Sequence, residues 1–158
     1  MNQIPITRNG ADLLKAELKQ LKSVDRPNVV EAIAEARAQG DLSENAEYDA
    51  AKERQGFIEG RLAQIEAILS QAIVIDPTSL NADGKCVFGS TIEIEDLDAE
   101  IKSIYQIVGD DEADIKNKKI SINSPLAKAM IGKEEGDEID FETPGGLKNY
   151  EIMKISYI

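Results

Sequence analysis

The feature that most constrains the fold is a pair of long helical patterns joined by the short stretch "GDLSEN", residues 40–45. In the second pattern, residues suited to a helix interface recur at alternating steps of three and four: Tyr48, Ala51, Gln55, Ile58, Leu62, Ile65 and Leu69. The first pattern has the same rhythm at Leu14, Leu18 and Leu21, and again at Val30 and Ile33. This is the spacing of a heptad seam. Because the connection is short, the sequence predicts a long antiparallel coiled-coil hairpin.

Pro27 interrupts the first helical pattern within "SVDRPNVV". Proline lacks a backbone N–H, and its ring collides with the preceding helical turn. We therefore expect a kink or a phase slip in the first helix, which then resumes and runs to Gln39.

The rhythm changes after "PTSLNADG", residues 77–84, which we interpret as a linker. Later runs such as "STIEIEDL" and "NYEIMKISYI" alternate with period two, as strands do. The fold class is therefore α+β. A coiled-coil domain is expected over residues 1–76, and a small antiparallel sheet domain with one short helix over residues 85–158.

The short helix of the second domain is expected within "SPLAKAMIG". Ser124 is suited to cap it, Pro125 suits its first position, and Gly132 is placed to end it. "TPGG", residues 143–146, is expected to form a hairpin turn between two strands.

Composition excludes several classes of function. The 158 residues carry a net charge of −12, with no histidine and one cysteine, Cys86. Such an acidic chain is not attracted to free duplex DNA or to an anionic membrane. Without histidine, serine–histidine hydrolysis and histidine-ligated zinc are excluded, and Cys86 is expected to be a small buried apolar residue. No apolar run approaches the roughly 20 residues of a membrane span, and no signal peptide is visible, so we expect a cytoplasmic protein.

The stretch between the helical patterns presents two carboxylates, Asp41 and Glu44. One interpretation is capping, with Asp41 as the N-cap of the second helix and Glu44 as its N3 residue. In the other, two exposed acids at the end of a long arm complete a Mg²⁺ site that a partner half-supplies, since hard cations prefer oxygen ligands. The spacing alone leaves both interpretations open.

Other residues beside the turn suit a supporting role. Arg37 and Lys52 are either ordinary solvated charges or contacts for a phosphate backbone. Asn45 both donates and accepts hydrogen bonds, and Tyr48 places an aromatic ring near the seam.

The stretch "GDLSENAEYDAAKE" resembles the tip signature of bacterial Gre-type transcript-cleavage factors, a family of transcription elongation factors. The likeness covers nearly the whole chain and includes "ITRNGADLLKAEL", "VFGSTIEIED", "SPLAKAMIGKEEGD" and "TPGGLKNYEI". The tip and "SPLAKAMIGKEEGD" are specific enough to make chance similarity an inadequate explanation.

The resemblance implies a mechanism that depends on a partner. In this family a C-terminal domain similar to FK506-binding proteins docks on the rim of the secondary channel of RNA polymerase, and the coiled coil enters the channel. Two tip acids, by position Asp41 and Glu44, help to hold a catalytic Mg²⁺ in the polymerase active site. The polymerase then hydrolyses the 3′ end of backtracked RNA, so the factor is not an enzyme by itself and has no cofactor of its own.

The resemblance also implies contact residues. Those expected to meet RNA or polymerase near the tip are Arg37, Asn45, Tyr48 and Lys52. Those expected to take part in docking are Ser121, Ser124 and Pro125. We expect the factor itself to be monomeric.

Three alternatives stay open. An inhibitor of the same architecture would plug the channel without stimulating cleavage. An FK506-binding-like prolyl isomerase would need an aromatic-lined pocket, and the second half has few aromatic residues: Phe88, Tyr105, Phe141, Tyr150 and Tyr157. A chaperone-like hairpin would need an apolar tip, whereas "GDLSEN" contains one apolar residue, Leu42.

Overall fold

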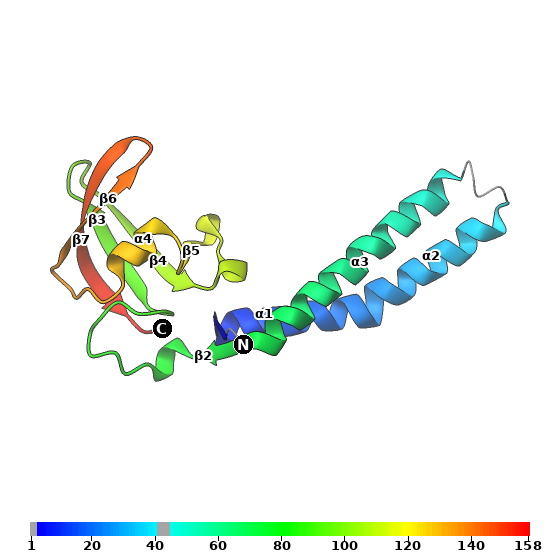
Figure 1. Ribbon diagram of the computed structural model, residues 1–158, viewed down its shortest axis with the longest axis horizontal. Coiled ribbons are helices and arrows are strands. Elements are labelled where there is room, and N and C mark those ends of the chain that lie inside the picture. Colours follow the sequence, from blue (N-terminus) through cyan, green and yellow to red (C-terminus); the bar gives the residue numbers. More distant parts are fainter. Residues whose placement is uncertain (1–2, 41–44) are drawn as a thin grey trace. The chain divides into compact units, whose positions relative to one another are not determined.

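The computed structural model describes residues 3–40 and 45–158, and the chain divides into two compact units. The first unit contains residues 11–72, and the second contains residues 3–10 together with 73–158 (Figure 1). The second unit thus combines residues 3–10 with the second half of the chain, and it also includes the stretch 77–84 interpreted from sequence as a linker. That stretch begins with a 3₁₀ turn, Pro77–Ser79, in which Pro77 is buried.

The first unit is a helical hairpin. Its elements are α1 (Arg8–Gln20, whose first turn belongs to the second unit), a π-helical turn η1 (Leu21–Asp25), α2 (Arg26–Ala38) and α3 (Ala46–Gln71). Helices α2 and α3 run side by side (Figure 1). Their buried faces contain Val29, Ile33, Ala36, Ala51, Ile58, Leu62, Ile65 and Ile68. No helix in residues 3–40 or 45–158 combines the length and the apolar character needed to cross a bilayer.

The phase slip expected before Pro27 is present as η1. The backbone N–H of Arg26 donates to the carbonyl of Leu21, a wider turn than the α-helical one. This turn lies where the ring of Pro27 would otherwise collide with the carbonyl four residues before it. The extra residue shifts the phase, so Val29 is fully buried whereas Val30 is 52% exposed. The prediction that Val30 lies on the seam is therefore wrong.

The seam of α3 follows the sequence for most of its length. Ile58, Leu62 and Ile65 are buried as predicted. At the C-terminal end Ile68 is buried instead of the predicted Leu69, which is half-buried.

Exposed ion pairs join the helices of the first unit. Arg26 meets Glu59 at 2.8 Å, and Lys22 meets Glu66 at 3.1 Å. Hydrogen bonding to the Arg26 guanidinium lowers the pKa of the Glu59 carboxyl. Exposed pairs of this kind contribute little stability, so the buried apolar face holds the hairpin together.

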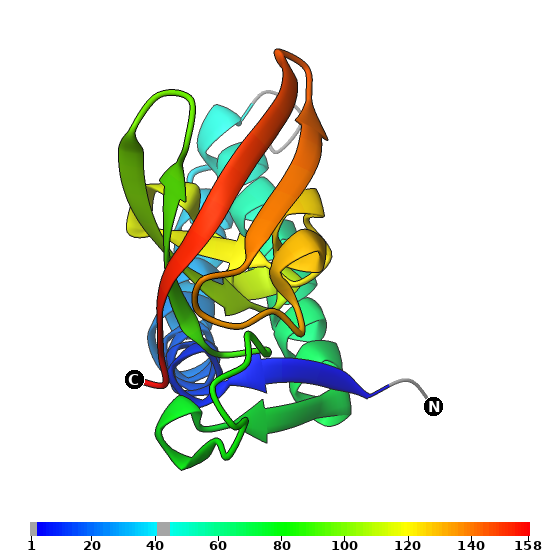
Figure 2. The same cartoon turned by 90° about the vertical axis from the view of Figure 1, so that its left-hand side faces the viewer.

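The second unit contains a small sheet of β1 (Ile4–Thr7) and β2 (Ala72–Ile75, whose first residue belongs to the first unit). It also contains a five-stranded sheet in the order β5-β4-β3-β7-β6 (Figure 2). The five strands are β3 (Thr91–Asp96), β4 (Ile101–Val108), β5 (Lys119–Ser121), β6 (Glu138–Thr143) and β7 (Gly146–Ser156).

Strand β5 pairs parallel to β4, while the other neighbours are antiparallel. The prediction of a purely antiparallel sheet is therefore wrong. The segment from β4 to β5 contains two 3₁₀ turns, η4 (Asp110–Glu112) and η5 (Ile115–Asn117), and returns the chain in the same direction instead of forming a hairpin.

The inner face of the large sheet carries the core of the second unit. Its fully buried side chains include Ile92, Ile94, Ile107 and Ile152. The thiol of Cys86 lies in the same core with no exposed surface, as the sequence predicted. The hairpin turn predicted over residues 143–146 joins β6 to β7.

Helix α4 (Pro125–Met130) lies against β6 and contributes the fully buried Met130 to the core. The hydroxyl of Ser124 accepts the N–H of Ala127 at 3.2 Å, and Gly132 follows the helix with φ of +84°. A positive φ at this point suits glycine, so the predicted cap and stop signals are confirmed.

Candidate functional site

The candidate site lies at the end of the hairpin where α2 gives way to α3. Asp41 and Glu44, the two acids on which the predicted chemistry depends, lie outside the described residues 3–40 and 45–158. Their role as metal ligands therefore stays a prediction. The structure does describe the residues on both sides of them.

Asn45 is the N-cap of α3. Its side-chain oxygen accepts the N–H of Tyr48 at 3.1 Å, which satisfies one of the free donors at the helix start. Its amide nitrogen donates to the carbonyl of Ala36 at 2.7 Å, across the turn in α2. Asn45 thus ties the two helix ends together.

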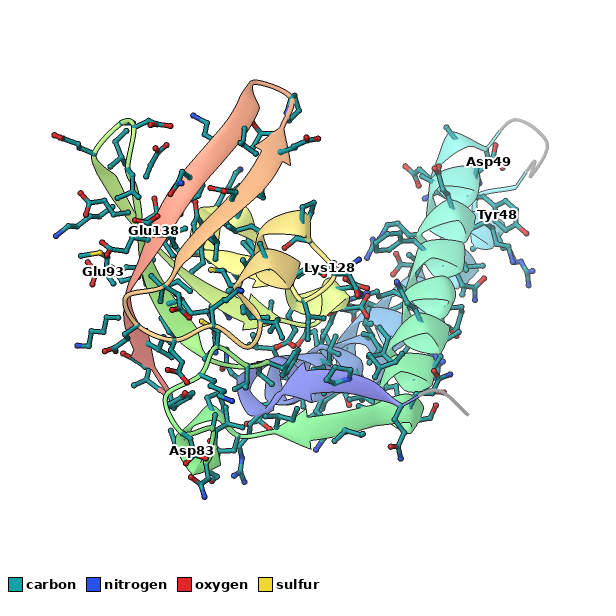
Figure 3. All side chains as sticks on the ribbon, turned by 60° about the vertical axis from the view of Figure 1, so that its left-hand side comes forward. Tyr48, Asp49, Asp83, Glu93, Lys128 and Glu138 are labelled. Atoms are coloured by element: carbon teal, nitrogen blue, oxygen red, sulfur yellow. The ribbon has the colours of Figure 1, made fainter. Side chains whose placement is uncertain are left out.

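This cap corrects the capping interpretation of the two acids. Because α3 begins at Ala46 with Asn45 as its N-cap, Asp41 and Glu44 are not the N-cap and N3 residues of this helix. The acids that occupy its first turn are Glu47 and Asp49, where they complement the positive end of the helix dipole. Figure 3 labels Asp49 on this turn. Capping of α3 therefore gives no reason for the two carboxylates of the turn.

Arg37 and Lys52 come together from different helices. Both line one hollow of about 270 Å³, Arg37 from α2 and Lys52 from α3. The guanidinium of Arg37 lies over the ring of Tyr48, 5.9 Å from its centroid, while Lys52 donates to the side-chain oxygen of Gln55 at 3.2 Å. The predicted basic pair thus lies at one place beside the turn.

The second predicted region is the loop between β5 and α4. Ser124 caps α4 and also donates its hydroxyl to the carbonyl of Ser121 at 2.7 Å. Pro125 is exposed at the first position of the helix, where its missing N–H costs nothing. The structure therefore holds Ser121, Ser124 and Pro125 in one tight turn.

Asp110, which the sequence analysis missed, organises this turn. One carboxylate oxygen of Asp110 accepts a hydrogen bond from the hydroxyl of Ser121. The other oxygen accepts a hydrogen bond from the side-chain amide of Asn123 at 2.9 Å. The N–H of Asn123 donates in turn to the hydroxyl oxygen of Ser121 at 3.0 Å. The two hydrogen bonds that Asp110 accepts lower the pKa of its carboxyl, and the bond from Ser121 has the larger effect. Asp110 follows β4 and Ser121 ends β5, so only the parallel pairing of those strands brings them together.

Within residues 3–40 and 45–158, no three acidic, histidine or cysteine side chains are grouped so as to hold a metal ion.

Comparison with known protein families gives matches over both halves of the chain. Residues 4–74 match the family described as "Transcription elongation factor, N-terminal". Residues 81–157 match the family described as "Transcription elongation factor, GreA/GreB, C-term".

Individual relatives give the same result at high identity. The transcription elongation factors GreA of Neisseria meningitidis serogroup B and of Ralstonia nicotianae are each 61% identical to this chain over 158 residues, which is 100% of both chains in each case. Among solved structures, the crystal structure of GreA factor homolog 1 of Thermus thermophilus is 26% identical and covers 98% of this chain and 99% of its own, with a TM-score of 0.45. That score is too low to establish a common fold over the whole chain, so the relationship rests on the sequence matches.

Proposed function

Since this chain belongs to the GreA/GreB family of transcription elongation factors, we propose that it acts on RNA polymerase that has backtracked and extruded the 3′ end of its RNA. In this proposal the helical hairpin enters the secondary channel of the polymerase and places its turn beside the active site. The polymerase then hydrolyses the RNA and resumes elongation. The factor has no activity alone, works as a monomer and acts in the cytoplasm.

The observation that carries the proposal is the capping of α3 by Asn45. The spacing of the two acids is equally compatible with helix capping and with metal binding. With Asn45 as the cap, capping of α3 no longer accounts for Asp41 and Glu44, and their proposed role is to supply oxygen ligands for a Mg²⁺ shared with the polymerase. When bound, Mg²⁺ polarises the phosphodiester and activates water for hydrolysis.

The basic pair supports the same proposal. Arg37 and Lys52 line one hollow beside the turn, in a chain whose net charge is −12. Two cations held at one place in an acidic protein favour a local anionic partner, and the phosphates of extruded RNA are such a partner. Their role in this proposal is to hold the strand, while the acids of the turn serve the chemistry.

Docking on the rim of the channel is assigned to the second unit. We propose that this unit resembles FK506-binding proteins. We also propose that its turn of Ser121, Ser124 and Pro125 faces the polymerase. The three hydrogen bonds that join Asp110, Ser121 and Asn123 favour this turn as a docking element, because a preorganised loop loses little entropy on binding.

Prolyl isomerisation is the weaker candidate. A hollow of about 450 Å³ beside α4 is lined by Lys128, Ala129, Ile131, Lys133, Glu138, Ile139 and Asp140, none of which is aromatic. Phe141 and Tyr150 instead stack on each other with centroids 5.4 Å apart. These side chains do not provide the aromatic pocket that such an isomerase requires.

The experiment that tests the proposal is a cleavage assay. The full-length protein is added to backtracked RNA polymerase complexes that carry 3′-labelled RNA. We expect short 3′ fragments to be released faster than by polymerase alone, followed by renewed elongation. Binding to polymerase without any increase in cleavage would instead support the channel-binding inhibitor.

A further inference from the structure

The hollow that holds Arg37 and Lys52 has two chemically different parts. The two cations lie on its lining together with the amide of Gln55. The rest of the lining is aliphatic and comes from a single helix, α2, through Val30, Ile33 and Ala34. A site for a phosphate alone would need only the first part.

The aliphatic part is accessible to solvent. Val30 is 52% exposed, and Ala34, one helical turn further on, is also exposed. Ile33 beneath them is buried and belongs to the seam. The π-helical turn before Pro27 is the reason, because it places Val29 in the seam and turns Val30 outward. Single exposed apolar residues are common, but here two lie one helical turn apart beside two cations.

The contacts of the two cations leave N–H donors for an anionic group. The guanidinium of Arg37 lies over the ring of Tyr48, so the contact uses the flat face of the guanidinium. The N–H donors of the guanidinium lie in its plane and point away from this contact. Lys52 donates to Gln55, and an ammonium group has further donors. A nucleotide combines a phosphate with a flat, largely apolar base. Proteins that bind single strands combine a basic groove with aromatic side chains on which bases stack, and here the aliphatic Val30 and Ala34 would take the place of the aromatic surface.

We propose that this hollow binds one unpaired nucleotide of the extruded RNA, with its phosphate on Arg37 and Lys52 and its base against Val30 and Ala34. The inference rests on the proposed function and adds a base contact to the phosphate contact. An aliphatic surface accepts any base, so the contact is independent of RNA sequence. It fixes the register of the strand relative to the turn of the hairpin.

The test compares two kinds of RNA in backtracked polymerase complexes. One has an intact extruded 3′ segment, and the others carry one abasic nucleotide at each extruded position in turn. The full-length protein is used as wild type, as Val30→Gln, and as Ala34→Leu, which fills the hollow. Val24→Gln is the matched control, because Val24 is also an exposed valine, 41% exposed, but does not line the hollow. Circular dichroism checks that each variant is folded.

We expect Val30→Gln and Ala34→Leu to raise the factor concentration for half-maximal cleavage about three- to tenfold on intact RNA, the loss expected when one apolar contact is removed. One abasic position should weaken the wild type by a similar factor and abolish the difference between wild type and Val30→Gln. The effect of Val30→Gln should persist at high salt, whereas that of the double variant Arg37→Ala/Lys52→Ala should shrink, because only the phosphate contact is screened.

The outcomes separate the two proposals. If Val30→Gln and Ala34→Leu match Val24→Gln on every RNA while the double variant is impaired, the base contact is refuted and the phosphate contact stands. If the wild type does not stimulate cleavage of any RNA, the proposed function fails, and the base contact fails with it.

Discussion

The carboxylate of Glu112 accepts the backbone N–H of Thr7 at 3.0 Å, although the two residues are 105 positions apart in the chain. The same carboxylate accepts the hydroxyl of Thr7 and the N–H of Gly109, the latter at 3.0 Å. The Thr7 hydroxyl oxygen also accepts the N–H of Gly10 at 3.1 Å, so it caps the start of α1. Within the second unit, the end of β1 and the start of α1 are thereby fixed to the turn that follows β4.

Replacement of Gly10 by alanine tests this arrangement. A Cβ at Gly10 would collide with the Glu112 side chain, which is held by three hydrogen bonds and cannot move without breaking some of them. We expect Gly10→Ala to lower the free energy of unfolding by about 1–3 kcal/mol. Thermal unfolding and the amide exchange rates of Thr7 and Gly109 provide the measurement.

Gly60 is the matched control for this substitution. It lies inside α3, and a Cβ there would meet nothing within 4 Å. Gly60→Ala should therefore stabilise the protein by up to about 1 kcal/mol through helix propensity. If the two substitutions changed stability in the same direction, the Thr7–Glu112 arrangement would not be a constraint on the fold.

Neutral substitutions at the turn should impair cleavage and spare stability. Asp41→Asn and Glu44→Gln each remove a carboxylate, and an amide is a poorer Mg²⁺ ligand. Because metal assistance is worth several kcal/mol, stimulated cleavage should fall at least about a hundredfold. The melting temperature should not change, since Asn45 caps α3.

The control for the turn is Asp49→Asn, which neutralises an acid on the first turn of α3. Its cleavage rate should stay close to that of the wild type. Raised Mg²⁺ should partly restore Asp41→Asn and Glu44→Gln if their defect is metal occupancy. Full activity of both with a lowered melting temperature would show that the acids have a structural role only.

Asp110→Asn should weaken binding to polymerase without slowing the chemical step. The substituted amide has one acceptor oxygen in place of two, so it can accept from Ser121 or from Asn123 but not from both, and the turn at Ser121 would lose order. Loss of about one hydrogen bond raises the concentration for half-maximal cleavage roughly three- to tenfold at an unchanged maximal rate. Asp111→Asn, at the exposed neighbouring acid, should have no such effect. A fall in maximal rate at unchanged affinity would contradict a positioning role for Asp110.

The pH dependence of this effect follows from the lowered pKa of Asp110. Because the pKa of Asp110 is lower in the folded protein, the stabilisation by its carboxylate is fully present above the unfolded pKa of about 3.9. This stabilisation is lost as the pH falls through the lower folded pKa. The difference in affinity between wild type and Asp110→Asn should therefore be constant from about pH 6 to pH 8. Affinity titrations across that range would reveal any slope, and a steep one would mean that another group controls the turn.

The single thiol gives a direct measure of opening of the second unit. Cys86 is fully buried, and burial raises the pKa of its thiol to about 12. Because the thiolate is the reactive form, an alkylating reagent at pH 8 should modify the native protein at least about a hundredfold more slowly than the urea-unfolded protein. Rapid modification of the native protein would show that the core around Cys86 opens readily.

The sequence by itself determined the elements of this protein that depend on local spacing. The heptad rhythm specified a helical hairpin, Pro27 specified a break in the first helix, and Ser124, Pro125 and Gly132 specified the limits of α4. Each of these signals acts over one or two turns of chain, where steric clashes and backbone donors are set by adjacent residues. The family resemblance was equally a property of the sequence, because its motifs are continuous.

Only the tertiary structure decided the features that depend on phase or on distant segments. The sequence placed the slip near Pro27 but not its size, and one additional residue in η1 exchanged Val29 for Val30 in the seam. The capping interpretation made Asp41 the N-cap of α3, whereas the structure has Asn45 in that position, and the amide of Asn45 also reaches Ala36 in α2. Strand direction is also nonlocal, because a period-two pattern is the same for parallel and antiparallel partners. The parallel pairing of β5 with β4, and with it the contact of Asp110 with Ser121, therefore arises only when the chain has folded.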